Sequence, residues 1–278
     1  MNFVYLIPRL VRHFMPETLA RYLLKRRWLI QPGLESNDPI GAANRYIQIL
    51  ANYKISIQGK RILVFGYGGR LAIGVELLKR GAAHVVLCDH FISLDHERNQ
   101  QLLPQYENYL IEDGGLIKPR AEFITLLHGD IRDLAIQKEV LLVDCVLSNS
   151  VYEHLHDVDG ITHALAGLTV PNGVHLHFVD LRDHYFKYPF EMLTYSSRIW
   201  TSFLNPTSNL NRFRLLDYKN IFERYFQRVE IDVIERLEKE FEAIHSRVRP
   251  EFLSGDIAVD SVSLIQIFTE KPGIAALS

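Results

Sequence analysis

The chain has 278 residues and a mass of 32.2 kDa, enough for one large domain with its own hydrophobic core. Hydrophobic residues make up 47% and charged residues 23%, as in soluble globular proteins, which excludes extended disorder, collagen-like repeats and coiled coil. The net charge of −2 argues against a general nucleic-acid binder, which needs a basic excess. Cys88 and Cys145 form no disulfide framework or multi-cysteine zinc pattern and favour a reducing, cytoplasmic location.

The first 34 residues differ in charge from the rest of the chain. They carry six basic residues and one acid, a net +5, whereas the remaining 25 basic and 32 acidic residues leave −7. No apolar run in this segment approaches the roughly 20 residues that cross a bilayer, and a signal-peptide pattern is absent. We expect residues 1–54 to be a helical flap, with one or two amphipathic helices broken near Pro16, packed on the body. Peripheral contact with an anionic membrane surface is the alternative.

From Gly59 onward, short β-branched runs alternate with longer helical patterns. The predicted strands are 61–66, 84–89, 122–127, 142–149, 173–180, 229–234 and 261–268. The predicted helices are 71–80, 94–111, 154–168, and one from an N-cap at Asp217 to about Phe226. This order predicts an α/β protein with a Rossmann-like, mostly parallel sheet covered by helices on both faces.

Two regions depart from the alternation, 184–214, which is rich in aromatic residues, and 235–260. We expect both to be insertions that cap the ligand-binding edge of one domain over 55–278. In open α/β sheets, ligands bind beyond the carboxyl ends of the strands, so the functional residues should follow the predicted strands.

A glycine-rich turn follows the first predicted strand, with the sequence Gly66, Tyr67, Gly68, Gly69, Arg70. Glycine lets backbone amides approach a ligand at a helix N-terminus, where the helix dipole favours negative charge. Asp89 stands 23 residues after Gly66, at the end of the next strand, where a carboxylate can bind ribose hydroxyls. The pair predicts an adenosine-containing ligand. Leu71 takes the place where a dinucleotide fingerprint has glycine or alanine, which weakens a pyrophosphate interpretation.

Four motifs in order resemble those of class I S-adenosylmethionine-dependent methyltransferases. They are 62–69, Cys88-Asp89, His128-Gly129-Asp130-Ile131, and 143–155, and the resemblance spans about residues 55 to 235. It implies a seven-stranded sheet with an antiparallel last strand, and S-adenosylmethionine as cofactor. A narrower similarity, carried by 174–184, Trp200 and 211–218, points to the subset associated with bacterial glycan or natural-product assembly.

The resemblance also implies roles for individual residues. The glycine turn would lie beneath the methionine part of the cofactor, Asp89 would bind the ribose, and Asp130 with Ile131 would bracket the adenine. The adjacent His90 is a further predicted cofactor contact. Asn149 and Ser150 would flank the transferred methyl group. The chain departs from the family at Val64 and Arg70, where an acid and a glycine are usual, so Arg70 is expected to contact the methionine carboxylate. An ordinary helix N-cap is the structural interpretation of Asp130.

Methyl transfer to an alcohol or phenol requires removal of a proton, a task that suits histidine. His184 follows a predicted strand and lies four residues from Asp180, whose carboxylate would orient its ring. We predict His184 as general base, with His154 as second candidate; a histidine that shapes the pocket wall is the alternative for either. His175 and His177 share one strand face, but packing and local hydrogen bonds account for them better than a metal, so no metal site is predicted.

Aromatic and basic residues crowd the region after the fifth strand, and serve either as an acceptor-binding wall or as cap packing. They are Tyr185, Phe186, Tyr188, Phe190, Tyr195 and Trp200, with Arg182, Lys187 and Arg198. From this region and from Asn44, Arg45 and Tyr46, which precede the first strand, the predicted acceptor contacts are Tyr46, Arg182, Asp183, Tyr188 and Trp200.

The leading functional hypothesis is O-methylation of a small hydroxylated acceptor, such as a natural product, a sugar or a lipid-linked glycan, by a monomer or dimer. One alternative is an NAD(P)-dependent Rossmann oxidoreductase, which would bind a dinucleotide and need a hydride-site pair such as tyrosine with lysine. A second alternative is a non-catalytic member that binds the cofactor or a partner, for which Val64 and Arg70 would be the clue.

Overall fold

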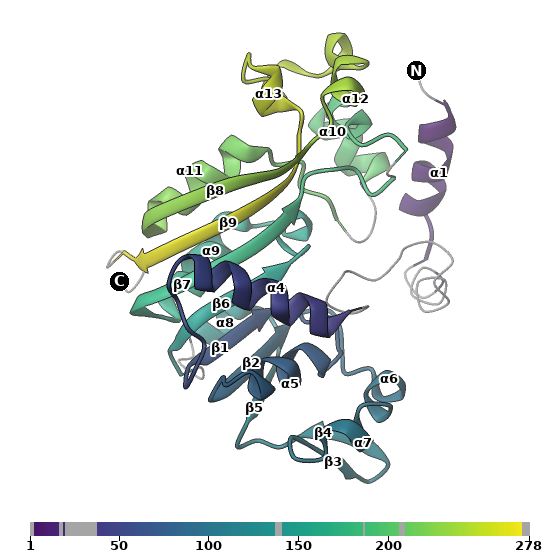
Figure 1. Ribbon diagram of the computed structural model, residues 1–278. Coiled ribbons are helices and arrows are strands. Elements are labelled where there is room, and N and C mark those ends of the chain that lie inside the picture. The colour runs from purple at the N-terminus through teal and green to yellow at the C-terminus, as the bar shows by residue number, and fades with distance from the viewer. Residues whose placement is uncertain are drawn as a thin grey trace.

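The computed structural model describes residues 3–16, 19, 38–136, 141–185, 187–205 and 209–273. Its centre is a seven-stranded sheet (Figure 1) with the order β5 (Ile124–His128), β2 (His84–Asp89), β1 (Arg61–Phe65), β6 (Val143–Asn149), β7 (Thr169–Asp180), β9 (Val262–Pro272), β8 (Phe226–Arg236). The first five strands in this order pair in parallel, and β9 is antiparallel to both of its neighbours. The predicted Rossmann-like sheet with an antiparallel last strand is confirmed.

The central strands are buried on both faces, which explains their nearly continuous apolar sequence. In β1, Ile62 and Val64 belong to one hydrophobic cluster, and Leu63 and Phe65 belong to the cluster on the opposite face. The first face is covered by α4 (Pro39–Asn52) and α5 (Ala72–Lys79). The second is covered by α8 (Ile131–Ile136), α9 (Val158–Gly167) and α11 (Leu215–Tyr225) (Figure 1). The two layers of helices leave the ends of the strands to carry the site.

The helix predicted over 94–111 is wrong. This segment forms two short helices and the start of a hairpin: α6 (His96–Gln100), α7 (Leu103–Tyr106) and β3 (Leu110–Asp113), which pairs with β4 (Leu116–Pro119). Gly114 and Gly115 close the hairpin with φ of 60° and 77°, the left-handed conformation that glycine tolerates in tight hairpin turns.

Two helix starts also differ from the prediction. A 3₁₀ turn, η1 (Tyr152–His154), precedes α9, and the helix begins only at Val158 because the Asp157 carboxylate accepts the Gly160 N–H (2.9 Å). At α11 the N-cap is Arg214, and Asp217 lies three residues inside, where its carboxylate accepts the Arg214 backbone N–H (2.8 Å). Asp217 thus stabilises the helix start from the N3 position of a capping box.

The two regions outside the alternation pack on each other near the end of β7. The first holds η2 (Glu191–Thr194), α10 (Ser197–Ile199) and η3 (Trp200–Leu204); the second holds α12 (Glu238–Glu242), η4 (His245–Arg247), η5 (Pro250–Phe252) and α13 (Ile257–Asp260). They share one hydrophobic cluster, formed by Phe190, Met192, Leu193, Trp200, Leu204, Leu210, Phe241 and Val248. Because both regions contribute to this cluster, they form a single cap over that end of the sheet (Figure 1).

The N-terminal helix α1 (Phe3–His13) docks on the cap through polar side chains. Tyr5 is fully buried and donates its hydroxyl hydrogen to Asp183 Oδ2 (2.5 Å). Arg9, 6% exposed, forms an ion pair with the same carboxylate and lies over the Trp200 ring. Asp183 itself is fully buried. Its predicted contact with an acceptor is therefore wrong, because the carboxylate anchors α1.

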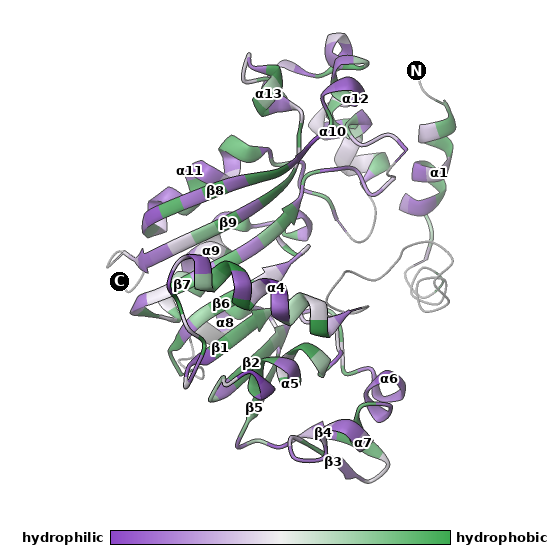
Figure 2. Ribbon diagram, in the orientation of Figure 1, coloured by the Kyte–Doolittle hydropathy of each residue, from purple (hydrophilic) through white to green (hydrophobic). Residues whose placement is uncertain are grey.

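The outward face of α1 is apolar. Its exposed large side chains, together with that of Phe14 just after the helix, are between 37% and 67% accessible; those on the helix are Phe3, Val4, Ile7, Leu10 and Val11. Hydrophobic and hydrophilic residues alternate along α1 (Figure 2), but the polar ones face the protein. This reverses the usual amphipathic arrangement. Among the described residues no helix has the length and apolar character of a membrane span.

Candidate functional site

The carboxyl ends of four parallel strands meet at one edge of the sheet. The register aligns Phe65 at the end of β1 with Cys88 of β2, and Asp89 with His128 at the end of β5. Val64 of β1 pairs with Leu147 of β6, and β6 ends two residues later at Asn149. The predicted site residues Gly66, Asp89, Asp130 and Asn149 therefore come from four strand ends to the same edge.

The Asp89 carboxylate connects the glycine turn to the loop that follows β2. Oδ2 accepts the Gly68 N–H (3.1 Å), and Oδ1 accepts the N–H groups of Phe91 (3.0 Å) and Ile92 (2.9 Å). A carboxylate has about four acceptor positions, so one remains for a ligand hydroxyl. Gly66 has φ of 80°, and a Cβ there would lie 2.3 Å from the Val151 side chain. Only glycine fits this close approach of the turn to the segment after β6.

Asn99, which sequence reasoning missed, holds the same turn in place. It is fully buried on α6, donates from Nδ2 to the Gly69 carbonyl (2.9 Å), and accepts the Leu71 N–H at Oδ1 (2.9 Å). Asn99 thereby supplies a partner for the Leu71 N–H, and it adds a second donor to the Gly69 carbonyl, which also accepts the Asp95 N–H (3.0 Å). A single asparagine 28 residues beyond its partner has no local pattern that could have identified it.

The remaining residues of the predicted cofactor turn differ in exposure. Tyr67 is 6% exposed and belongs to the hydrophobic core, Arg70 is half-buried, and His90 is exposed with its ring against Phe91 (4.3 Å between centroids). Phe91 is itself 68% exposed. An accessible aromatic surface thus lies directly beside Asp89.

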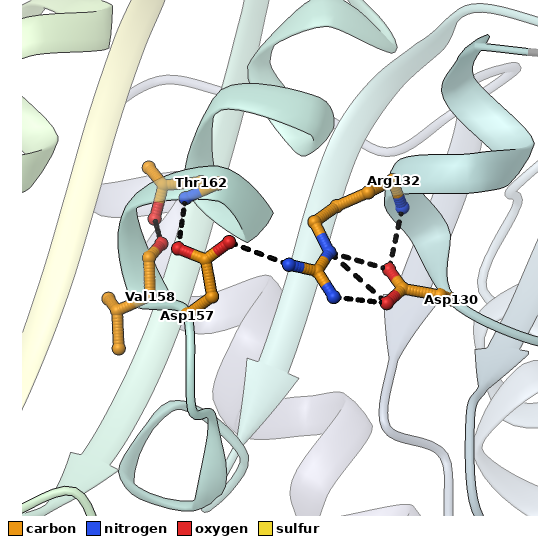
Figure 3. Close-up of polar contacts among 6 residues, drawn as sticks. Asp130, Arg132, Asp157, Val158 and Thr162 are labelled. Atoms are coloured by element: carbon orange, nitrogen blue, oxygen red, sulfur yellow. Dashed lines mark hydrogen bonds and ion pairs between the residues drawn. The ribbon is translucent and has the colours of Figure 1, made fainter.

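Asp130 is engaged by an arginine two residues away (Figure 3). Its Oδ1 accepts the Arg132 backbone N–H (3.0 Å), which caps α8, and both oxygens bind the Arg132 guanidinium. Arg132 also donates to Asp157 Oδ2 (2.6 Å) at the start of α9. Hydrogen bonds from Arg132 lower the pKa of Asp130 to about 2. The helix-cap interpretation is confirmed. The predicted adenine contact through this carboxylate is not, because its acceptor positions are occupied.

Ile131 is 1% exposed and lies in the cluster that contains Leu63 and Val146. It is a core residue rather than part of an adenine-binding wall, which corrects the prediction. The pattern of a strand followed by Asp130 and an apolar residue marks a helix start here, with the apolar residue pointing inward.

Helix α4 covers the end of β6. Arg45 donates to Asn149 Oδ1 (3.0 Å), and its guanidinium lies 4.0 Å from the centre of the Phe178 ring. Ser150 has φ of 54° and donates its backbone N–H to the Phe178 carbonyl (2.9 Å). Tyr46 is fully buried in the core against Phe178, so its predicted acceptor contact is wrong. Arg45, one residue earlier, is the member of this run that reaches the strand end.

The two predicted catalytic histidines lie together beyond β6 and β7. The ring centroids of His154 and His184 are 4.8 Å apart. Burial, and secondly the nearby His154, lowers the pKa of His184 to about 4. His154 Nδ1 lies 2.8 Å from the Asn209 carbonyl oxygen, which only accepts hydrogen bonds, so Nδ1 carries a proton.

Glu153 completes a cluster with these histidines, and sequence reasoning missed it. One ligand-type atom from each of Glu153, His154 and His184 lies within 4.8 Å of the others. Glu153 is 3% exposed, and neither carboxylate oxygen has a hydrogen-bond partner among the described residues. Burial raises its pKa well above the usual value. Its place in the run before His154 was visible in the sequence, but the convergence with His184 was not.

Asp180 is paired with Arg182. Oδ1 accepts the backbone N–H (3.0 Å) and Nε–H (2.8 Å) of Arg182, and Oδ2 accepts from Nη2 (2.7 Å). Arg182 also donates to Glu235 Oε2 (3.2 Å), on β8. Much of the Asp180 charge is thus neutralised by Arg182, which weakens the predicted role of this carboxylate as the group that orients His184.

The aromatic stretch after β7 packs largely within the cap. Trp200 is 2% exposed, donates Nε1–H to the Leu210 carbonyl (3.1 Å), and lies beneath the guanidinium groups of Arg9 and Arg212. Its predicted acceptor contact is therefore wrong. Tyr188 is half-buried with its ring edge-on to Tyr5 of α1. Phe186 lies outside the described residues.

His175 and His177 form a buried hydrogen-bonded chain within the fold. His177 Nδ1 bonds Ser148 Oγ (2.7 Å), His177 Nε2 bonds His175 Nδ1 (3.3 Å), and His175 Nε2 bonds Thr169 Oγ1 (2.8 Å). All four ring nitrogens thus have partners. Burial lowers the pKa of His177 to about 3, so the ring is neutral at ordinary pH. The packing interpretation of these two residues accounts for this arrangement.

Comparison with known proteins finds similarity at the level of structure alone. No protein-family model matches the chain, and no curated protein matches it significantly. Among solved structures, a proposed sarcosine dimethylglycine methyltransferase of Galdieria sulphuraria superposes with a TM-score of 0.53 at 13% identity, covering 92% of this chain and 98% of that one. The chain has a Rossmann-like methyltransferase fold.

Two further solved structures agree at the level of fold. A proposed O-methyltransferase of Nostoc punctiforme matches with a TM-score of 0.50 and 12% identity over 84% of this chain and 56% of that one. A Haemonchus contortus phosphoethanolamine N-methyltransferase 2, solved with phosphomonomethylethanolamine and S-adenosylhomocysteine, gives 0.50 and 16% over 83% and 53%. The chain spans little more than half the length of these two proteins. The methyltransferase fold thus recurs in proteins named for different acceptors.

Replacing Asn99 by alanine should lower the free energy of unfolding by about 1–3 kcal/mol, because the Leu71 N–H loses its buried partner and the Gly69 carbonyl keeps only the Asp95 N–H. Equilibrium urea unfolding measures this change. The neighbouring exposed Gln100→Ala is the control and should change stability by less than about 0.5 kcal/mol. Equal stability of the two variants would show that Asn99 does not support the turn.

Asp130→Asn should reduce stability near neutral pH by about 1 kcal/mol, a value that allows for screening because Arg132 is 42% exposed. The folded pKa of Asp130, about 2, lies below the unfolded value of about 3.9. The carboxylate therefore stabilises the fold above about pH 4, and this contribution disappears as the pH falls from about 4 to about 2.

Urea unfolding at several pH values between about 7 and 3 tests this dependence. Asp133→Asn, at an exposed position on the same helix, is the matched control. A stability difference between wild type and Asp130→Asn that stays constant over this range would contradict the ion pair with Arg132.

Proposed function

We propose that the protein is an S-adenosylmethionine-dependent methyltransferase that methylates a hydroxyl group of a small acceptor. The observation that carries the proposal is the convergence of the glycine turn, Asp89 and Asn149 at the carboxyl edge of a sheet with a methyltransferase fold. The S-adenosylhomocysteine in the Haemonchus structure supports the choice of cofactor. The presence of two histidines beyond β6 and β7 supports O-methylation, since a hydroxyl acceptor must lose a proton.

The residues present fit this cofactor, with Phe91 in place of Asp130 as the candidate contact for the base. The remaining acceptor position of Asp89 suits one ribose hydroxyl, and the exposed Phe91 ring beside it offers a face for a nucleoside base. Gly66 and Gly68 would let the backbone approach the methionine moiety, with Arg70 as the candidate contact for its carboxylate and His90 next to Asp89. When bound, the cofactor supplies an electrophilic methyl group on a sulfonium.

The work of this chain's own residues is positioning. The acceptor has to lie in line with the bond that breaks, which an enclosed edge can enforce. Asn149 and Ser150 fix the end of β6, and α4 covers it through Arg45. His154 and His184 lie on the segments that continue from β6 and β7, so the acceptor hydroxyl would face them.

Two rival functions make different binding predictions. An NAD(P)-dependent oxidoreductase would bind a dinucleotide, and a non-catalytic member would bind the cofactor but transfer no methyl group.

The narrower glycan or natural-product acceptor class stays part of the proposal. Tyr185, Tyr188 and Tyr195 pack around Tyr5 of α1, and the aromatic character of this part of the cap is in keeping with an acceptor that has a sugar or planar ring.

We also propose that α1 rests on an anionic membrane surface. Its apolar face, with Phe3 66% and Ile7 60% exposed, has the chemistry of an interfacial helix. The helix contains no acidic residue and ends with Arg12 and His13, within a segment 1–34 of net charge +5. Such a contact would place the cap, which α1 covers, next to a lipid-linked acceptor.

Calorimetric titration of the purified chain with S-adenosylhomocysteine and with NADH tests the cofactor assignment. We expect binding of S-adenosylhomocysteine without a signal from NADH. Asp89→Ala should weaken it by about 1–3 kcal/mol, because a ribose hydroxyl loses its acceptor. Asp130→Asn is the control and should bind normally, since Arg132 already occupies that carboxylate. Heat from NADH alone would refute the methyltransferase proposal.

Cosedimentation with lipid vesicles tests the membrane contact. Wild-type protein should bind vesicles that contain phosphatidylglycerol more strongly than pure phosphatidylcholine vesicles. Ile7→Glu should lower this binding more than about tenfold, because an aliphatic side chain that would be buried in the lipid is replaced by a charged one. Leu216→Glu, at an exposed apolar position on α11, is the control. Equal binding of both variants would contradict the proposal, and self-association lost in Ile7→Glu would assign the face to a second copy.

A further inference from the structure

The cluster of Glu153, His154 and His184 contains the chemistry of a cation site. Each residue offers one ligand atom, and these atoms lie within 4.8 Å of one another. Nitrogen and oxygen ligands of one zinc ion lie about 2.0–2.2 Å from the metal. Small side-chain rotations that move each ligand atom by about an ångström would therefore let all three reach one ion. The residues come from two segments, after β6 and after β7, that the sheet holds side by side. The fold therefore brings the donor atoms together without a large movement.

The Glu153 carboxylate supplies an independent observation. It is 3% exposed, and neither oxygen has a hydrogen-bond partner within the described parts of the chain. Burial of a carboxyl group without partners is costly. The nearby Arg182 is engaged with Asp180 at 2.7 and 2.8 Å and with Glu235 at 3.2 Å. A ligand that accepts electron density from Glu153 would remove this cost.

The segment that carries the cluster is held by a second set of hydrogen bonds. His154 Nδ1–H donates to the Asn209 carbonyl (2.8 Å), and the Asn209 side chain donates back to the His154 carbonyl (3.1 Å). Asn211 donates its backbone N–H to the Glu153 carbonyl (2.9 Å). A backbone carbonyl on one ring nitrogen is the usual outer partner of a metal-binding histidine, because it fixes the tautomer that leaves Nε2 to the metal.

We propose that Glu153, His154 and His184 bind a divalent transition-metal cation. Two imidazoles and one carboxylate suit Zn²⁺ and neighbouring first-row cations better than Mg²⁺ or Ca²⁺, which prefer sets of oxygen ligands. Three protein ligands leave a coordination position open, as in catalytic sites. A cavity of about 10 Å³, lined by Glu153 together with Asp180 and Arg182, adjoins the Glu153 side of the cluster and has room for about one water molecule.

The site deepens the proposed function, on which its catalytic meaning rests. A cation at this place would bind the acceptor hydroxyl and lower its pKa, so that the oxygen loses its proton before it attacks the methyl group. The proton passes to solvent or to a basic residue, and the new oxygen–carbon bond replaces the sulfur–carbon bond. His154 and His184 would then act as ligands, which replaces the general-base role expected from the sequence.

Titration of the full chain, stripped with EDTA, with ZnCl₂ by isothermal calorimetry tests the site without any methyl transfer. We expect one Zn²⁺ per chain. Glu153→Gln and His184→Gln should each weaken Zn²⁺ binding by at least about 100-fold. Mutation of a residue that only hydrogen-bonds to a metal ligand already lowers metal affinity by about 10- to 100-fold. His156→Gln, an exposed histidine two residues from His154, is the matched control and should bind like wild type.

Co²⁺ absorption and thermal melting complete the experiment. Bound Co²⁺ should give the visible spectrum of mixed nitrogen and oxygen ligands in wild type and His156→Gln and lose it in Glu153→Gln. Zn²⁺ should raise the melting temperature of wild type and not of folded Glu153→Gln, because a ligand of the native state stabilises it. Absence of binding, or equal binding by Glu153→Gln, would overturn the site.

The two proposals fail separately. S-adenosylhomocysteine is titrated into the same stripped samples. Binding of S-adenosylhomocysteine without Zn²⁺ binding overturns the cation site and keeps the methyltransferase. Zn²⁺ binding lost in Glu153→Gln, without S-adenosylhomocysteine binding, supports the cation site and overturns its proposed role in methyl transfer.

Discussion

The parallel alignment of β1, β2, β5, β6 and β7 is the constraint on which the rest of the structure depends. Strands buried on both faces need helices above and below, and the connections through those helices bring every strand back in the same direction. The carboxyl ends consequently meet at one edge. Gly66, Asp89, Asn149 and Asp180 reach this edge because each stands at or just after the end of its strand.

At that edge, carboxylates serve mainly to hold the protein together. Asp89 is bound by three backbone amides, Asp130 by Arg132, and Asp183 by Tyr5 and Arg9 of α1. Each buried carboxylate requires partners, since an unpaired charge away from water is costly. Glu153 is different, because no hydrogen bond reaches its oxygens within the described residues. The contrast between satisfied and unsatisfied acids separates structural carboxylates from one that still needs a ligand.

The cap and α1 extend the fold beyond the sheet. Both insertions contribute to one hydrophobic cluster, and α1 docks on it through the polar groups of Tyr5 and Arg9, with Leu6 packed against the cluster. The polar attachment leaves the apolar face of α1 outward. One helix thus covers the cap with its inner face and exposes apolar side chains on its outer face, which the proposed membrane contact would use.

The sequence by itself determined the seven strands of the main sheet, the Rossmann-like class and the strand ends that carry functional residues, because apolar strand runs and glycine turns are patterns of neighbours along the chain. It did not determine which partner each side chain meets. Tyr5 and Asp183 are 178 residues apart, Arg45 and Asn149 are 104 apart, and Asn99 was hidden in a segment mistaken for one long helix. Burial of Tyr46, Ile131 and Trp200, and the meeting of Glu153 with His184, were likewise decided by tertiary packing. Hydrogen bonds and ion pairs act over a few ångströms in space, and only the folded chain sets those distances.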